Sequence, residues 1–178
     1  MSNIKKTIIT AMLIAVCVVL PMAFHMIPMA GIILLPMHIP VLLAGLVCGP
    51  LFGLAAGMIA PVVSHFLTGM PPQGILQGMI IELGVYGFIS GFVLNYVRTK
   101  RASFDLYIAL ISAMLAGRII GGVFSGMFFV EGSTISMWVE LYFVTALPGI
   151  VIQLAFIPSV VMALERERVI PLRYPIKA

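Results

Sequence analysis

Long apolar stretches with almost no charged side chains limit most strongly which folds this chain can adopt. Of the 178 residues, 62% are hydrophobic and 9% are charged, whereas a soluble domain carries about 25% charged residues. So few charges cannot cover a surface that faces water, and the sequence therefore predicts an integral membrane protein. The length favours one membrane domain over residues 1–178.

Six apolar stretches are candidates for membrane-spanning helices, each of which needs roughly 20 apolar residues unless the segment is buried in protein. We expect the spans at about 7–24, 36–49, 50–69, 73–97, 105–129 and 136–164. The second stretch is short, and the sequence CGP at 48–50 predicts a tight turn, because Gly commonly ends a helix and Pro begins one. The predicted fold is an all-α integral membrane bundle of six transmembrane helices.

Basic residues indicate how this bundle is oriented. With six spans, both termini and the loop after the fourth span lie on one side of the membrane. Nine of the ten Lys and Arg residues fall in these three regions: Lys5, Lys6, Arg98, Lys100, Arg101, Arg166, Arg168, Arg173 and Lys177. Because cytoplasmic loops are enriched in Lys and Arg, both termini are predicted to be cytoplasmic.

A small set of ionisable side chains lies inside the predicted spans, namely His38, His65, Glu82, Arg118 and Glu140. Charged groups at membrane depth are costly, which makes them candidates for a functional site. At 1.5 Å per residue, Glu82 lies roughly 14 Å and Arg118 roughly 17 Å from the outer ends of their spans. The other three are expected near the outer surface, with His38 just inside the start of its span. Since the inner half carries no such residue, we expect a pocket that opens outward and is closed toward the cytoplasm.

Each of these side chains has more than one possible role. Glu82 and Arg118 can neutralise each other as a structural pair, line a ligand pocket, or do both. His38 and His65 can be hydrogen-bonded residues between helices, and Glu140 can simply be solvated. Methionines in the outer half, Met37 among them, can line a pocket or fill the core, because their side chains are flexible and polarisable.

Small residues recur at every fourth position in three spans, where they let helices approach closely. The stripes are Ala113, Gly117, Gly121 and Ser125 in the fifth span, Gly49, Gly53 and Gly57 in the third, and Ala11 and Ala15 in the first. We expect the two longer stripes to pack inside the bundle.

The motifs of several enzyme classes are absent from the sequence. It contains no G-x-x-x-x-G-K-[ST] phosphate loop, so the chain is not expected to hydrolyse ATP itself. It also lacks H-E-x-x-H, C-x-x-C and G-x-S-x-G, and its histidines do not have metal-ligand spacing. We therefore expect no catalytic residue, cofactor or metal site, and no nucleic-acid partner. The expected role is that of a membrane protein that binds a small molecule and needs a partner to move it.

Four segments resemble one known family. They are LPMHIPVLLAGLVCGPLFGLAAG at 35–57, LTGMPP at 67–72, AMLAGR at 113–118 and ALPGIVIQLAFIPSVVMAL at 146–164. In their order and spacing they resemble the substrate-binding S components of energy-coupling factor (ECF) vitamin transporters, over nearly the whole chain up to about residue 166.

The resemblance implies a function and a set of partners. An S component in a prokaryotic plasma membrane captures a vitamin or related micronutrient from outside. It then docks on a transmembrane coupling subunit that carries two cytoplasmic ATPases, and toppling of the S component carries the substrate inward. The family contacts the coupling subunit through an Ala-x-x-x-Ala pattern on the first helix, which AMLIA at 11–15 matches. Ala11 and Ala15 are therefore expected to be docking residues.

The substrate and two other classes of function stay open at this point. Arg118 suits a carboxylate such as that of pantothenate, which we favour, whereas Glu82 and Glu140 suit an amine or amide. Trp138 can stack on a ring or anchor the interface. A stand-alone carrier that uses Glu82 for proton coupling is the main alternative, and an integral membrane enzyme is another.

Overall fold

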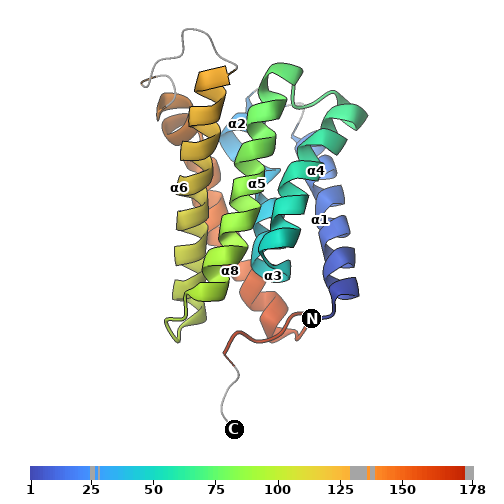
Figure 1. Cartoon of the computed structure of the whole chain (residues 1–178), viewed down its shortest axis with the longest axis vertical. Helices are drawn as coiled ribbons and strands as arrows, with labels where there is room; N and C mark the ends of the chain where they lie inside the picture. The colour runs from blue at the N-terminus through green and yellow to red at the C-terminus, as the bar shows by residue number, and fades with distance from the viewer. Residues whose placement is uncertain (25–26, 28, 129–135, 137–138, 175–178) are drawn as a thin grey trace.

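The computed structural model shows a bundle of helices that run along a common direction (Figure 1). The structure describes residues 1–24, 27, 29–128, 136 and 139–174. Its helices are α1 (Asn3–Ala23), α2 (Ala30–Leu34), α3 (His38–Cys48), α4 (Pro50–Thr68), α5 (Gln73–Tyr96), α6 (Ala102–Phe128) and α8 (Leu147–Arg166), with a π-helical segment over Glu140–Thr145. Within these residues there is no β-strand, and six helical segments are long and apolar enough to cross a membrane. The predicted all-α fold with six spans is confirmed.

The second span differs from its predicted form. It begins at Ala30 rather than near residue 36, and it consists of α2 and α3 separated by a break at residues 35–37. Leu35 adopts a left-handed conformation with a φ of 50°, and the ring of Pro36 has no N–H to continue a helix. As a result His38 lies about eight residues, roughly 12 Å, inside this span rather than at its outer start.

Close packing between helices follows the predicted stripes of small residues. A side-chain carbon added to Gly53 or Gly57 on α4 would collide with backbone carbonyl oxygens of α5. On α6, such a carbon on Gly117 would lie 2.6 Å from Cδ2 of Tyr86, and one on Gly121 would lie 2.7 Å from Cβ of Glu82. These contacts confirm that both longer stripes pack inside the bundle. They also place α5 between α4 and α6, as Figure 1 shows.

The last helix completes the bundle opposite α5. A Cβ on Gly149 of α8 would lie 2.6 Å from the carbonyl oxygen of Ile33 in α2. The amide nitrogen of the Gln153 side chain lies 3.5 Å from the carbonyl oxygen of Leu35, to which it donates. α8 therefore packs against the interrupted span, and Gln153 is a second donor to the Leu35 oxygen, which also accepts from the His38 N–H.

The two ends of the bundle differ in charge. The N-terminus, the α5–α6 turn and the C-terminal segment all lie at the lower end in Figure 1, and the basic residues gather there. Because Lys and Arg are enriched in cytoplasmic segments, we assign this end to the cytoplasmic side. The opposite end, with α2 and the α4–α5 loop, is the outer end.

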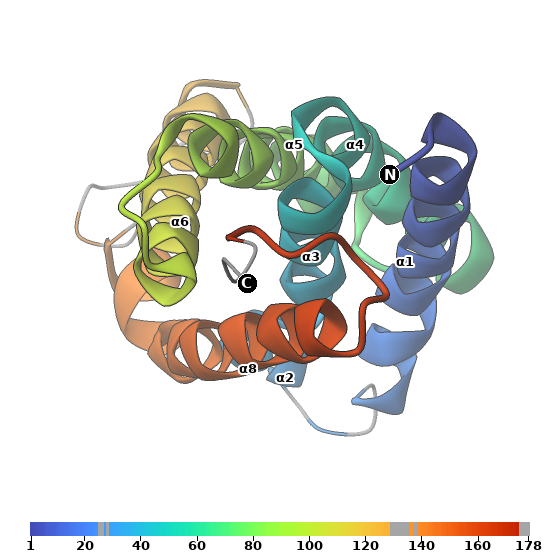
Figure 2. The same ribbon diagram turned by 90° about the horizontal axis from the view of Figure 1, so that it is seen from below.

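A C-terminal strap, defined as residues 167–174, crosses the cytoplasmic end below α3 (Figure 2). The Nζ of Lys5 donates to the Val169 carbonyl oxygen, and the Nε of Arg173 lies 2.7 Å from Oδ2 of Asp105. Asp105 is fully buried and also accepts hydrogen bonds from Thr99 and Tyr174. The expectation of an inner half without ionisable groups is thus wrong, because the tail folds back and neutralises a buried carboxylate there.

Candidate functional site

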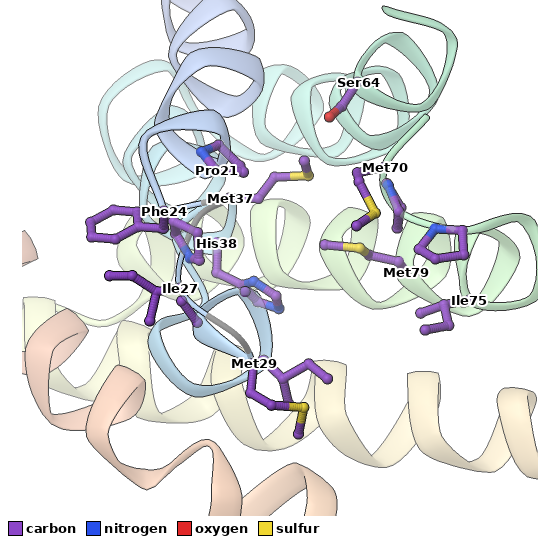
Figure 3. A pocket seen from close by; sticks show the side chains of 16 residues that line it. Pro21, Phe24, Ile27, Met29, Met37, His38, Ser64, Met70, Ile75 and Met79 are labelled. Atoms are coloured by element: carbon purple, nitrogen blue, oxygen red, sulfur yellow. The ribbon is translucent and has the colours of Figure 1, made fainter. Parts of the chain in front are cut away.

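An outer cavity of about 440 Å³ lies between the outer ends of the helices. Its walls come from the end of α1, from α2 and the break, from α4, from the loop at residues 69–72 and from the first turns of α5. Met37, Met70 and Met79 point into it from three different elements (Figure 3). His38 and Ser64 are polar side chains in a lining that is otherwise mostly Met, Pro and Ile.

A cluster of polar side chains lies further inside the bundle, next to the outer cavity. The polar cluster consists of His38 on α3, Glu82 and Tyr86 on α5, Arg118 on α6 and Gln153 on α8, and all five side chains are buried. Gln153 joins the cluster next to His38, because the Gln153 side chain and the His38 N–H both donate to the same Leu35 carbonyl oxygen. Glu82 follows the cavity residue Met79 by one helical turn, and Tyr86 by two. At 1.5 Å per residue these steps correspond to roughly 5 and 10 Å toward the cytoplasm.

His38 connects the outer cavity with the polar cluster. Its Nε2 lies 3.6 Å from Oε1 of Glu82, and its ring meets the Tyr86 ring edge-on, with centroids 5.1 Å apart. The break before α3 allows this arrangement, since it places His38 at membrane depth, beside Glu82. Among the described residues, the carboxylate of Glu82 lies beside His38 and forms no ion pair with Arg118. The structural pair of Glu82 and Arg118 that the sequence left open is not formed.

Arg118 reaches the cluster from α6. Its guanidinium carbon lies 5.7 Å from the centroid of the Phe143 ring, over which it stacks. Gly117, the residue before Arg118, packs against the ring of Tyr86. The side chain of Arg118 is only 2% exposed, and a guanidinium cannot lose its proton in a protein. A full positive charge is therefore held inside the membrane part of the bundle.

Several buried polar atoms of the cluster have no hydrogen-bond partner among the described residues. They are Nδ1 and Nε2 of His38, the hydroxyl of Tyr86, Nε and Nη2 of Arg118, and Oε1 of Gln153. Buried polar groups are nearly always hydrogen-bonded, and an unpaired one costs roughly 1–3 kcal/mol. By contrast, the buried polar side chains of the inner half, Thr10, Ser90 and Asp105, all have partners. The unmet hydrogen-bonding capacity is concentrated beside the outer cavity.

The residues predicted from the sequence divide into those the structure brings together and those it does not. Met37 lines the outer cavity, and His38, Glu82 and Arg118 meet in the polar cluster. His65 lies apart, since its Nδ1 is 2.8 Å from the Pro71 carbonyl oxygen and so ties α4 to the following loop. Glu140 is exposed at the start of the π-helical segment, and Trp138 lies outside the described residues.

Two members of the cluster, Tyr86 and Gln153, were not predicted from the sequence. Gln153 is an amide in an otherwise apolar run, IVIQLAF, and its polarity could have marked it. Tyr86 could not be recognised in this way, because a tyrosine in a membrane span is commonly a packed aromatic residue. Only its contact with the ring of His38 and with Gly117 places it in the cluster.

The predicted docking residues lie on the surface of α1. Ala11 and Ala15 are both exposed on α1, beside the exposed apolar side chains of Ile8 and Met12. Over the described parts of the chain, no three His, Cys, Asp or Glu side chains come together in a way that could hold a metal ion.

Comparisons with known proteins identify the family. No similar curated protein and no similar solved structure was found. Residues 5–164 match the family described as ECF transporter, substrate-specific component. The match covers all six spans, from the cytoplasmic end of α1 to the last turn of α8. The chain therefore belongs to the family of substrate-specific components of ECF transporters and is a multi-pass membrane protein.

Proposed function

We propose that this chain captures a small water-soluble micronutrient of the vitamin type at the outer face of a prokaryotic plasma membrane. It then delivers the ligand inward by docking on an ECF module, which consists of a transmembrane coupling subunit and two ATPase subunits. The observation that carries this proposal is the set of unpartnered polar atoms beside an outward-facing cavity. A bound ligand would supply the hydrogen bonds that these atoms lack.

The size of the outer cavity supports a compact ligand. Small-molecule pockets commonly have volumes of about 300–1,000 Å³, and at about 440 Å³ this cavity lies at the lower end of that range. A ligand of the size of pantothenate suits it better than a large vitamin such as cobalamin. The many methionine and proline side chains in the lining suit an aliphatic ligand body.

The exposed face of α1 supports docking on a partner. Ala11 and Ala15 stand one helical turn apart and are exposed, and the absence of bulk there would let another helix approach closely. As an S component, the chain is expected to use this face against the coupling subunit. The ATPase subunits would supply the energy.

The capture function is tested by native mass spectrometry of the detergent-purified protein, followed by identification of any compound released on denaturation. A stoichiometric compound of vitamin size supports capture. Uptake of that compound into proteoliposomes that contain the protein and an ECF module, dependent on ATP, supports delivery. A protein that retains nothing and binds no vitamin contradicts the proposal.

The contact between His38 and Glu82 favours one alternative, a stand-alone proton-coupled carrier. A buried histidine beside a carboxylate forms a pair that can hold a proton within the membrane. In this case the isolated protein in proteoliposomes would transport its ligand in response to a pH gradient, without an ECF module or ATP. Transport that requires the module and ignores the gradient excludes the carrier.

A further inference from the structure

We infer that the polar cluster binds the carboxylate of an anionic ligand through Arg118, and that this ligand also presents a hydrogen-bond donor to Gln153. This inference rests on the proposed function and specifies the chemistry of the ligand. It assigns the charged end of the ligand to the polar cluster and the aliphatic body to the outer cavity.

Arg118 carries a buried charge that has no direct ion-pair partner among the described residues. The carboxylate of Glu82 lies instead beside His38, 3.6 Å from its Nε2. A buried charge without a direct partner is more costly than a paired one. The stacking of Arg118 on Phe143 offsets part of this cost. A carboxylate of the ligand would give Arg118 a direct ion-pair partner.

The free hydrogen-bond donors on Arg118 have the geometry that a carboxylate requires. The two unpartnered nitrogens are Nε and Nη2, and in a planar guanidinium their N–H groups point from the same edge. This edge donates two parallel hydrogen bonds to the two oxygens of one carboxylate. The hydroxyl of Tyr86 also lacks a partner among the described residues and can donate a further hydrogen bond.

Gln153 provides a free hydrogen-bond acceptor in the cluster. The Nε2 of Gln153 donates to the Leu35 carbonyl oxygen, which fixes the amide so that Oε1 is the free atom. Oε1 can only accept a hydrogen bond. The atom that faces it must therefore carry a hydrogen, as a hydroxyl or amide N–H does. A ligand with a carboxylate and a hydroxyl or amide group satisfies both sides.

The experiment compares matched pairs of probes that differ in charge. Binding to the detergent-purified protein is measured by isothermal titration calorimetry with pantothenate and its neutral alcohol analogue pantothenol, and with nicotinate and nicotinamide. The compound retained on purification is identified in parallel. If two charge-assisted hydrogen bonds anchor the carboxylate, the anion of a pair that binds should bind at least about 100-fold more tightly than its neutral analogue.

Variants test the assignment to Arg118. Arg118→Lys keeps the charge but cannot donate from a planar edge, so it should reduce the preference for the anion, while Arg101→Lys on the cytoplasmic side should leave it unchanged. Wild-type protein that binds a neutral probe as tightly as its anion, or that retains a neutral or cationic compound, overturns the inference and leaves capture intact. Protein that is isolated empty and binds none of the four probes overturns the inference and the capture function together.

Discussion

We predict that the C-terminal strap stabilises the cytoplasmic end by pairing the buried carboxylate of Asp105. Asp105 has no exposed surface, and Arg173 is the cation paired with it, 2.7 Å away. The Nη2 of Arg173 also donates to the carbonyl oxygens of Leu94 and Val97, at the end of α5. These oxygens have no partner within the helix. Arg173→Ala removes the counter-charge and both hydrogen bonds in one step.

The expected loss of stability follows from these contacts. Breaking a buried ion pair by removing one partner costs roughly 3–5 kcal/mol. Asp105 keeps its hydrogen bonds from Thr99 and Tyr174, and the Arg173 side chain is 14% exposed, so the lower end of this range applies. We expect a loss of about 3 kcal/mol. For a chain of this length that corresponds to a decrease in Tm of about 6–12 °C.

The measurement is thermal unfolding of the detergent-purified variant. Its readout is the fraction of protein that remains monodisperse after heating. Arg166→Ala is the matched control, because Arg166 is exposed at the end of α8 and should change stability by less than about 0.5 kcal/mol. The double variant Asp105→Asn/Arg173→Ala should recover part of the loss, since the amide leaves no buried charge without a partner. If Arg173→Ala unfolds at the same temperature as Arg166→Ala, the strap does not stabilise the cytoplasmic end.

Three further predictions concern helix packing, ligand binding and docking. Gly53→Ala should destabilise the protein, because its methyl group would collide with the Gly87 carbonyl oxygen. Gly74→Ala should not, because nothing lies within 4 Å of the added carbon. Thermal unfolding of both variants checks this. Glu82→Gln should weaken binding of the retained compound about tenfold in calorimetry, because it removes the carboxylate that lies beside His38 and orients it. Unchanged affinity would contradict a role for this contact. Ala15→Trp should abolish ATP-driven uptake and leave ligand binding intact, because bulk on the exposed face of α1 blocks a partner helix; normal uptake would show that this face is not the docking surface.

Most of the architecture can be predicted from single segments of the sequence. Apolar length and the spacing of small residues are properties of single segments, so they predicted the six spans and the packing of Gly53 and Gly121. The membrane strengthens these signals, because a segment in lipid must form its backbone hydrogen bonds internally.

The composition of the site was decided by tertiary structure. A break at residues 35–37 moved His38 inward to Glu82, and the rotation of α5 and α6 against each other brought Tyr86 beside Arg118. Pairing depends on the depth and rotation of each helix, which a hydropathy pattern does not specify. The same holds for Asp105 and Arg173, 68 residues apart, since only the return of the tail across the cytoplasmic end brings them together. The sequence alone determined which side chains are costly to bury, and the folded bundle determined which of them have partners.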